Sequence, residues 1–341
     1  MRKYTHYSLL AHNTFGIEAY CDSFYEFETI AELQQVLREL DADSQLLILG
    51  GGSNMLFAGD FHGTVLHSAI KGCEATVQGD DVFLRCGSGE TWDDVVALCV
   101  SEGWHGAENL SLIPGTVGAS AVQNIGAYGV EVKDIIYKVE AVDVRTGECH
   151  SFSVSDCQYG YRKSRFKTEW QGRYVITHVT YRLSRCYIPN LTYGNIQKEL
   201  SMRGISEPTS QQLRDVIIDI RNAKLPDVKV EGNAGSFFMN PVVSKEKYLS
   251  LLATWPDMPH YTVDDSHEKI PAGWLIEKCG WKGRTLGRAG VHSKQALVLV
   301  NRGGATGQDV LTLCESICCD VKRIFDVEIR PEVIFVGRSE K

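Results

Sequence analysis

The chain has 341 residues, of which 43% are hydrophobic and 23% are charged. This composition is ordinary for a soluble globular protein, and the length suits roughly two or three domains better than a single core. The 43 acidic residues outnumber the 35 lysines and arginines, which gives a formal net charge of −8. A nucleic-acid-binding protein is therefore disfavoured, because binding to a phosphate backbone depends on a basic face.

Leader, membrane and metal signals are missing from the sequence. The N-terminus carries charges and lacks the sustained apolar core of a secretory signal, and no apolar run approaches the roughly 20 residues of a membrane span. The eleven cysteines are scattered and odd in number, which fits the reducing cytoplasm and predicts a cytoplasmic protein. The cluster Cys314, Cys318 and Cys319 follows an apolar helical pattern without histidine, so we predict a buried helix face and no metal.

Helices and strands alternate from the start of the chain. Thr29 and Glu32 form a capping box ahead of a helix that reaches Leu40. The apolar run Leu46–Leu49 predicts a strand that enters a tight turn at residues 50–54. Further along, the patterns predict a helix from Thr91 to Gly103 and strands over residues 135–144 and 174–182.

A change of character near residue 225 marks a domain boundary. A helix capped by Thr209 and Gln212 ends before Pro226, since proline disfavours helix in the preceding residue. Residues 225–235, with one proline and two glycines, are the best candidate for the boundary. Beyond it we predict helices near residues 245–255, 273–279 and 310–325, and strands over residues 296–301 and 327–336.

Two glycine-rich segments are candidates for holding a nucleotide: the first glycine loop, residues 50–54, and the second glycine loop, residues 113–129. Glycine accepts positive φ and lets backbone N–H groups approach a pyrophosphate without an intervening Cβ. Each cluster alone is more often a plain turn. Neither has the G-x-G-x-x-G spacing of a dinucleotide fingerprint, so a classical NAD-binding domain is disfavoured. The density of glycines and side-chain amides in the second loop favours a cofactor site.

Five segments in order resemble the signature sequences of the UDP-N-acetylenolpyruvoylglucosamine reductase family. They are Asn13-Thr-Phe-Gly16, Leu49-Gly-Gly-Gly-Ser-Asn54, the second glycine loop, Tyr159-Gly-Tyr-Arg-Lys-Ser-Arg-Phe166 and Gly232-Asn-Ala-Gly-Ser-Phe-Phe238. The resemblance runs from Asn13 to Val336, almost the whole chain. The segment Leu191-Thr-Tyr-Gly194 further resembles the tyrosine-bearing loop of one of the family's two types.

The resemblance implies an α+β protein with the vanillyl-alcohol-oxidase (PCMH-type) FAD-binding fold. Two α/β subdomains, residues 1–71 joined by the last strand at 327–341 and residues 72–224, would hold FAD. A C-terminal α+β domain, residues 225–326, would bind the substrate. The implied cofactors are FAD and NADPH, although the sequence does not distinguish NADPH from NADH. We expect no nucleic acid and no membrane insertion, and a monomer.

The implied reaction reduces the enolpyruvyl ether of UDP-N-acetylglucosamine-enolpyruvate to UDP-N-acetylmuramate for peptidoglycan synthesis. Hydride would pass from NADPH to flavin and then to the methylene carbon, with a proton delivered to the adjacent carbon. By motif match Arg162 would bind the developing enolate, Glu332 would assist at the same carboxylate, and Ser236 would donate the proton. Without the resemblance, a solvated basic loop, an edge-strand glutamate and a turn serine are the simpler interpretations.

The remaining site residues also follow from motif matches. For the uridine diphosphate we expect Tyr193, Lys224, Asn240 and Gln295, while Met239 stands where many members carry lysine. Two alternatives stay open: another FAD-dependent oxidoreductase of the same fold acting on an alcohol or sugar, and a nucleotide-sugar-binding protein without catalysis. The expected cofactor-binding residues are Gly50, Gly51, Gly52, Ser53, Asn54, Pro114, Gly115, Gly118, Ser120, Gln123, Asn124, Gly126, Ala127 and Tyr128.

Overall fold

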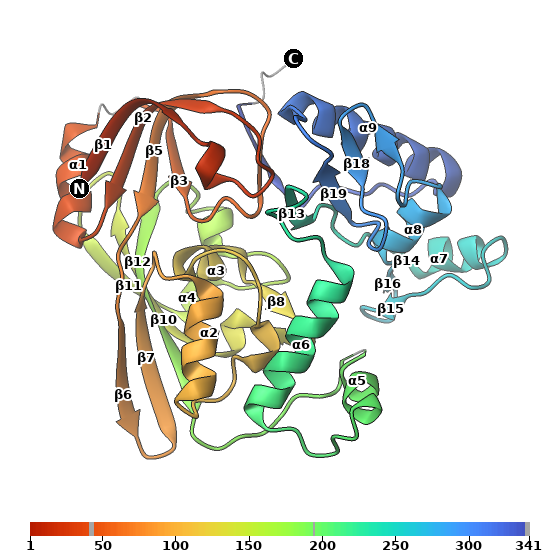
Figure 1. Cartoon of the computed structure of the whole chain (residues 1–341), viewed down its shortest axis with the longest axis horizontal. Coiled ribbons are helices and arrows are strands. Elements are labelled where there is room, and N and C mark those ends of the chain that lie inside the picture. The colour runs from red at the N-terminus through yellow and green to blue at the C-terminus, as the bar shows by residue number, and fades with distance from the viewer. Residues whose placement is uncertain (41–43, 194, 338–341) are drawn as a thin grey trace. The chain divides into compact units, whose positions relative to one another are not determined.

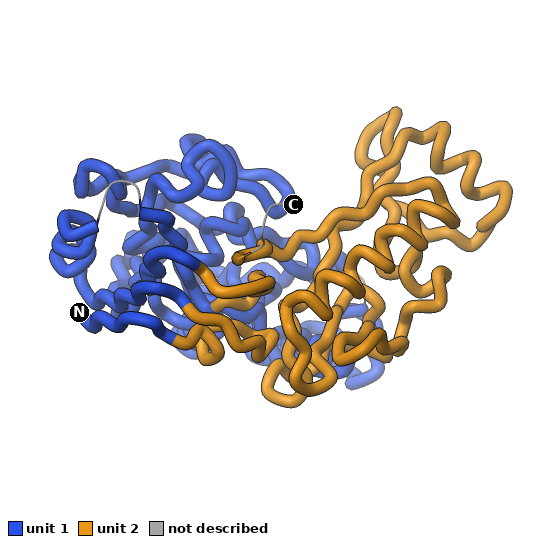
Figure 2. Tube along the Cα trace, turned by 90° about the horizontal axis from the view of Figure 1, so that it is seen from above, with its two compact units in different colours: residues 1–7, 21–51, 62–223 blue, residues 8–20, 52–61, 224–341 orange. Residues whose placement is uncertain are grey.

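A computed structural model describes residues 1–40, 44–193 and 195–337 (Figure 1). The chain divides into two compact units, coloured separately in Figure 2. The first unit comprises residues 1–7, 21–51 and 62–223, and the second comprises residues 8–20, 52–61 and 224–341. These two units do not correspond to the three functional domains expected from the resemblance. The three-domain division therefore stays a prediction.

The first unit begins with a four-stranded sheet in the order β1-β2-β5-β3. Helix α1 (Ile30–Glu39) starts where predicted, with the Thr29 hydroxyl accepting from the Glu32 N–H at 3.1 Å. The Glu32 carboxylate accepts from the Glu28 N–H at 2.7 Å, one residue before the Thr29 cap. The strands are β1 (Arg2–Ser8), β2 (Tyr20–Phe27), β3 (Leu46–Leu49) and β5 (Phe61–Ser68), and β3 confirms its prediction.

A five-stranded antiparallel sheet follows in the order β11-β10-β12-β7-β6. Helices α2 (Trp92–Ser101) and α3 (Val117–Gln123) place Trp92, Val96, Val117 and Ala121 in one hydrophobic cluster with this sheet. The second glycine loop contains α3, so the sheet supports it directly. The strands are β6 (Cys73–Gln78), β7 (Asp81–Gly87), β10 (Ile136–Asp143), β11 (Cys149–Ser153) and β12 (Tyr174–Ser184), which confirms both predicted strands of this region.

Helix α6 (Ser210–Lys224) completes the first unit. The Thr209 hydroxyl accepts from the Gln212 N–H at 3.2 Å, and the Gln212 side chain accepts from the Thr209 N–H at 2.9 Å, which confirms the predicted cap. The buried stripe Leu213, Val216, Ile217 and Ile220 packs with α5 (Ile196–Met202). Smaller elements of this unit are β8 (Gly126–Ala127), β9 (Val130–Glu131) and α4 (Val154–Cys157).

The second unit has its own sheets and its own core. One sheet has the order β13-β19-β18-β17, a second the order β14-β16-β15, and β20 pairs with β4 in parallel. The strands are β4 (Met55–Phe57), β13 (Asn233–Ser236), β14 (Val242–Ser244), β15 (Tyr261–Thr262), β16 (His267–Lys269), β17 (Thr285–Leu286), β18 (Ala289–Val291), β19 (Val298–Asn301) and β20 (Ile334–Val336). The helices are α7 (Lys245–Leu252), α8 (Ala272–Lys278) and α9 (Gly307–Phe325), all near their predicted places.

The last predicted strand is wrong over most of its length. We expected it from Val327 to Val336, but β20 covers only its last three residues, Ile334–Val336. Pro331 has no N–H to contribute to a ladder, and it makes a single isolated bridge to Phe238. A bend at Val333 then separates Glu332 from β20, so Glu332 does not lie in that strand.

The cysteines agree only in part with the sequence analysis. All eleven are free thiols. In α9, Cys314 is buried as predicted, Cys318 is partly buried and Cys319 is exposed, so the cluster does not form one buried face. Across residues 1–40, 44–193 and 195–337, no group of three potential metal ligands comes together. Within the same ranges, every helix is too short or too polar to cross a bilayer.

Candidate active site

The two glycine loops touch each other in the first unit. A Cβ on Gly50 would lie 3.0 Å from the Thr116 hydroxyl, and one on Gly51 would lie 3.2 Å from the Gly115 Cα. These distances are shorter than ordinary carbon contacts, so side chains at either glycine would push the loops apart. The two loops are about sixty residues apart in the sequence. Because they touch, they form one continuous backbone surface.

Residues 52–54 belong to the second unit and are fixed there. Gly52 has φ +60°, and a Cβ at this position would collide with the His12 carbonyl, so only glycine fits. The Asn54 side chain donates to the Glu332 carbonyl at 3.4 Å, and the Asn54 carbonyl accepts from the Ile334 N–H at 3.0 Å. Asn54, predicted for the cofactor, is thus also a support for the segment that carries Glu332. Ser53, which lies between Gly52 and Asn54 in the sequence, is partly buried.

Helix α3 anchors the middle of the second glycine loop. A Cβ on Gly118 would lie 3.0 Å from the Ser88 Cβ, and the Gly118 N–H donates to the Ser88 carbonyl at 2.9 Å. The Ser120 hydroxyl donates to the Val117 carbonyl at 2.7 Å and lies 3.1 Å from the Tyr181 hydroxyl. Ser120 is 1% exposed, so its side chain serves the helix and the sheet. Gly115, Gln123 and Ala127 are partly buried, and Pro114 is exposed.

Asn124 ends α3 and holds the loop to its neighbours. It adopts a left-handed conformation with φ +46° and is fully buried. Its amide nitrogen donates to the Gly160 carbonyl at 2.8 Å and to the Glu131 carboxylate at 3.2 Å, while its oxygen accepts from the Lys133 N–H at 3.2 Å. All groups of this side chain are therefore used within the protein, and a contact from Asn124 to a cofactor would involve its backbone.

The guanidinium of Arg162 is held by the second glycine loop. Arg162 lies in a tight turn closed by two hydrogen bonds between Gly160 and Lys163, at 2.9 and 3.0 Å, and has φ +52°, a costly conformation for a side-chain-bearing residue. Its Nη2 donates to the Gly126 carbonyl at 2.6 Å and its Nη1 to the Asn124 carbonyl at 3.3 Å. A side chain at residue 126 would crowd this arrangement, since its Cβ would lie 2.9 Å from Nη1.

Tyr128 joins this group from the end of the loop. Burial raises the pKa of its hydroxyl, and the nearby Arg221 guanidinium, to which it is hydrogen bonded, opposes that rise. Arg221 is itself largely buried, which lowers its pKa, and its Nε has no hydrogen-bond partner among the residues that the structure describes. A second cation therefore lies beside the loop, in a place that a bound anionic or strongly polar group could satisfy. The sequence analysis missed Arg221.

The tyrosine-bearing segment lies against the same loop. The Tyr193 ring meets the Tyr128 ring edge to face, with centroids 6.0 Å apart. The Asn109 side chain donates to the Tyr128 carbonyl and to the Asn190 carbonyl, both at 3.0 Å, and so ties the two segments together. Asn109 is 4% exposed and was also missed. Gly194, the last residue of the predicted motif, lies outside the described residues.

A partly buried ion pair connects the helices behind the loop. Arg214 on α6 contacts both carboxylate oxygens of Asp93 on α2, at 2.7 and 2.9 Å. The Asp93 carboxylate also accepts from the Leu112 N–H, directly before the loop. Burial raises the pKa of Asp93, but Arg214 and the Leu112 N–H outweigh it and hold the pKa below its usual value. The ion pair therefore connects α2, α6 and the start of the second glycine loop.

The segments that carry Ser236 and Glu332 lie side by side in the second unit. Ser236 ends β13 beside a bulge at Gly235, whose φ is +66°. The next residue, Phe237, accepts from the Glu332 N–H at 2.8 Å, and the Met239 N–H donates to the Arg330 carbonyl at 2.9 Å. The two backbone segments are thus hydrogen bonded side by side. Ser236 is exposed, and Glu332 is partly buried.

Two of the predicted substrate residues lie near the start of α8. The Asn240 side chain accepts from the Ala272 N–H at 2.9 Å. The Gln295 side chain accepts from the Leu297 N–H at 3.3 Å, and a Cβ on Gly273 would lie 3.4 Å from it. Lys224 is the exposed last residue of α6. Arg162 and Tyr193 belong to the first unit, whereas Lys224, Ser236, Asn240, Gln295 and Glu332 belong to the second.

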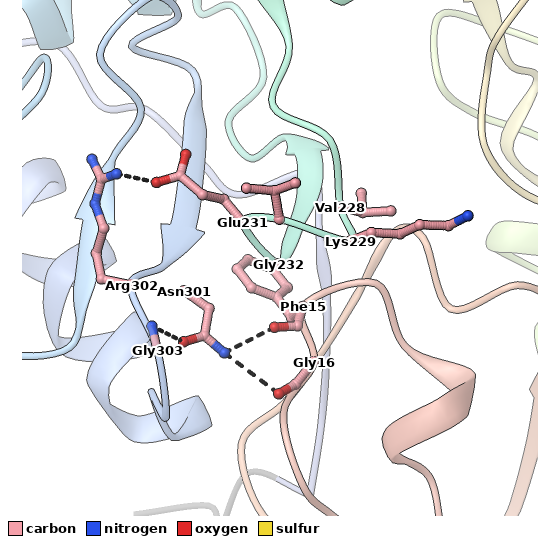
Figure 3. Close-up of a pocket in the computed structure, with 10 residues that line it drawn as sticks. Phe15, Gly16, Val228, Lys229, Glu231, Gly232, Asn301, Arg302 and Gly303 are labelled. Carbon is pink, nitrogen blue, oxygen red and sulfur yellow. Dashed lines mark hydrogen bonds and ion pairs between the residues drawn. The ribbon is translucent and has the colours of Figure 1, made fainter.

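A cavity of about 380 Å³ lies within the second unit (Figure 3). Its wall includes residues 228–232 and 301–303, where Arg302 pairs with Glu231. Figure 3 shows the Asn301 amide donating to the carbonyls of Phe15 and Gly16, at 3.0 and 3.4 Å. No predicted catalytic residue lines this cavity, and we do not assign it to the substrate.

The residues of the first unit suit FAD. The touching glycines Gly50, Gly51 and Gly115 leave a backbone surface without side chains, as a pyrophosphate needs. Arg221 adds a cation beside Tyr128, and its buried Nε is a donor that no described residue satisfies. A glycine backbone surface and a buried guanidinium are groups that can hold a flavin and its phosphates.

Comparison with known proteins gives two matching family models. One, described as an FAD binding domain, matches residues 22–153, and the other, described as the C-terminal domain of UDP-N-acetylenolpyruvoylglucosamine reductase, matches residues 226–336. The first range contains both glycine loops, and the second contains Ser236, Asn240, Gln295 and Glu332.

Relatives that align over nearly the whole chain agree with these two family models. The chain is 51% identical over 332 residues to a UDP-N-acetylenolpyruvoylglucosamine reductase of Bacteroides fragilis, covering 97% of this chain and 99% of the relative. It is 48% identical to the reductase of Porphyromonas gingivalis, covering 97% and 98%. The crystal structure of the reductase (MurB) from Thermus caldophilus aligns over 98% of both chains with a TM-score of 0.67 and 21% identity, which shows the shared fold.

Proposed function

The chain belongs to the UDP-N-acetylenolpyruvoylglucosamine reductase family, and we propose that it reduces the enolpyruvyl ether of UDP-N-acetylglucosamine-enolpyruvate to UDP-N-acetylmuramate. It is an FAD-dependent oxidoreductase of peptidoglycan precursor synthesis that uses NADPH. The observation that carries this conclusion is the 51% identity over nearly the full length of both chains. An alcohol oxidase of the same fold and a non-catalytic binding protein are set aside by this membership.

FAD, when bound, supplies the hydride, and the protein must hold the substrate, stabilise its charge and protonate it. The two glycine loops and the Tyr128–Arg221 pair are the groups that would hold FAD. We assign the pyrophosphate to the backbone around Gly50, Gly51 and Gly115, because that surface is free of side chains. The three functional domains, residues 1–71 with 327–341, 72–224 and 225–326, form part of this proposal.

Arg162 stabilises the negative charge that develops on the substrate carboxylate. A guanidinium stays ionised in any surroundings and can bind a carboxylate with two parallel hydrogen bonds. The carbonyls of Gly126 and Asn124 fix its orientation through bonds of 2.6 and 3.3 Å, and the constrained turn restricts its backbone. A cation positioned before the reaction needs no reorganisation as the charge forms, which is the main source of electrostatic catalysis.

Ser236 donates the proton to the carbon beside the carboxylate, and Glu332 acts at the carboxylate itself. Their segments are joined through the hydrogen bond from the Glu332 N–H to the Phe237 carbonyl at 2.8 Å. This bond and the Asn54 contacts hold the two side chains on neighbouring, mutually supported segments. Positioned acid groups contribute through fixed geometry, which a serine needs because its intrinsic acidity is weak.

The uridine diphosphate contacts Tyr193, Lys224, Asn240 and Gln295. Tyr193, in the segment that resembles the tyrosine-bearing loop, assigns this chain to the tyrosine-loop type of the family. The support for Tyr193 is its edge-to-face contact with Tyr128 and the Asn109 bridge. Asn240 and Gln295 both lie at the start of α8. We further propose that the enzyme works as a cytoplasmic monomer, in line with its free thiols.

The test is an anaerobic spectrum of the purified protein. NADPH should bleach the flavin absorbance, and the enolpyruvyl UDP-sugar should then restore it. The same sugar without its enolpyruvyl group is the control and should leave the flavin bleached. Bleaching without recovery would refute the proposed substrate.

A further inference from the structure

Two cysteines outside the proposed site face each other across the β6–β7 hairpin. Cys73 and Cys86 are register partners, and their Sγ atoms are 3.4 Å apart. Figure 1 shows β6 beside β7, and β6 is the edge strand of the five-stranded sheet. Neither thiol has a part in the function described above.

The backbone geometry at this pair favours a disulfide. Next to it, the Gly87 N–H donates to the Gly72 carbonyl at 2.9 Å, so Gly72 and Gly87 are a hydrogen-bonded pair. Hydrogen-bonded and non-hydrogen-bonded pairs alternate in an antiparallel ladder, which makes Cys73 and Cys86 a non-hydrogen-bonded pair. Such pairs bring Cα atoms to about 4.5 Å, inside the range of roughly 4.4–6.8 Å that disulfides span.

The two thiols differ in access and in acidity. Cys86 is fully buried, whereas Cys73 is partly exposed. Their mutual hydrogen bond lowers the pKa of Cys73 and, with burial, raises that of Cys86. Lys71 also favours ionisation of Cys73, and Glu90 opposes it. The accessible sulfur is therefore the one that ionises and reacts first.

We propose that Cys73 and Cys86 form a redox modification site, a dithiol that a small-molecule disulfide of the glutathione class converts reversibly into a cross-strand disulfide. The Cys73 thiolate attacks one sulfur of the oxidant, which breaks the oxidant's S–S bond and releases one thiol. Cys86 then attacks the mixed disulfide at Cys73 and releases the second thiol. The two cysteines lose two hydrogens, which leave on the two released thiols, and the oxidant gains both electrons.

The closed bond should spare the flavin loops. Cys86 is followed by Gly87, where a Cβ would collide with the Ile70 carbonyl, so this end of β7 has no room to move. The exposed edge strand β6 therefore makes the adjustment when the sulfurs approach. The Ser88 carbonyl keeps its bond to the Gly118 N–H, and turnover should be unchanged. A cross-link also restricts the unfolded chain, so the melting temperature should rise.

Other cysteines of the chain are less suited to this bond. Cys314 and Cys318 are four residues apart on α9, where Cβ atoms lie about 5–6 Å apart, compared with about 3.5–4.5 Å in disulfides. Cys149, Cys186 and Cys319 are exposed. These three should take up the oxidant as mixed disulfides rather than form a protein disulfide.

The test treats the full-length, FAD-loaded protein with oxidised glutathione, blocks remaining thiols under denaturing conditions and maps peptides by mass. We expect a link between the Cys73 and Cys86 peptides, lighter than the two thiols by about 2 Da, reversed by dithiothreitol. Cys86→Ser should trap glutathione on Cys73, and Cys73→Ser should leave Cys86 unmodified. Cys314→Ser, the matched control, should leave the link intact.

Three results would overturn the proposal. The first is full alkylation of both Cys73 and Cys86 after oxidation of the wild-type protein. The second is modification of Cys86 in Cys73→Ser as fast as in the wild type, because Cys86 would then react on its own. The third is a linked protein that melts at a lower temperature than the reduced form or has lost turnover.

Discussion

Replacing Gly126 by alanine perturbs the position of Arg162 without touching its charge. A Cβ at residue 126 would lie 2.9 Å from Nη1 of Arg162 and 2.9 Å from the Val130 carbonyl oxygen. Ordinary carbon contacts are about 4.0–4.5 Å, so both the guanidinium and the backbone at Val130 must shift. The guanidinium is the more mobile group, and its displacement breaks the 2.6 Å bond to the Gly126 carbonyl.

The size of the effect follows from that lost bond. A hydrogen bond from a charged group contributes about 1.5–3 kcal/mol, and each ~1.4 kcal/mol of transition-state stabilisation is about tenfold in rate. Gly126→Ala should therefore slow the reduction of substrate by roughly 10- to 100-fold. The added methyl should cost about 1–3 kcal/mol of stability, which leaves the protein folded.

Rapid mixing measures this prediction, since bleaching by NADPH and recovery with substrate can be timed separately. Gly126→Ala should slow the recovery step, counted per bound flavin, far more than the bleaching step. Gly160→Ala is the matched control in the turn that carries Arg162, because a Cβ there meets only the Lys163 Cβ at 3.8 Å. Equal recovery rates in the two variants would refute the idea that the loop positions Arg162.

Four further substitutions test individual groups. Arg162→Ala and Glu332→Gln should each lower kcat far more than they raise KM, and a change in KM alone would make either residue a ground-state binder. Ser236→Ala should bleach normally with NADPH but recover about 100- to 10,000-fold more slowly with substrate, and equal slowing of both steps would indicate a structural serine. The pKa of Asp93 is lowered in the folded state, so its pairing with Arg214 stabilises the fold above about pH 4 and is lost as pH falls through the folded pKa. Asp93→Asn should therefore unfold at lower urea concentration at neutral pH with a weaker acid dependence, and an unchanged urea midpoint would contradict this.

Local sequence signals predicted the helices and buried strands well. Capping residues such as Thr209 and Gln212 act over three or four positions, and the structure shows their reciprocal bonds. The final strand failed because Pro331 interrupts the ladder and its effect depends on a partner, Phe238, far away in the sequence. Strand β6, almost wholly exposed, has no apolar alternation that a pattern could detect.

In the candidate site, the sequence nominated some residues and missed others. Motif resemblance nominated Arg162, but nothing in the sequence indicated that carbonyls of the second glycine loop would hold it. Asn109 was missed because a buried amide that joins two loop carbonyls has no local signature. Arg221 was missed since its burial beside Tyr128 depends on tertiary packing. The side chains that position the site are thus harder to predict than those proposed to react.

The most direct test of the central claim is a single anaerobic titration of the purified protein with flavin bound. The account predicts a yellow protein that NADPH bleaches, and that one equivalent of the enolpyruvyl UDP-sugar restores while forming UDP-N-acetylmuramate. The flavin should leave the protein on acid precipitation, as non-covalent FAD does. A flavin that stays bleached after the UDP-sugar is added, with no UDP-N-acetylmuramate formed, would contradict the account.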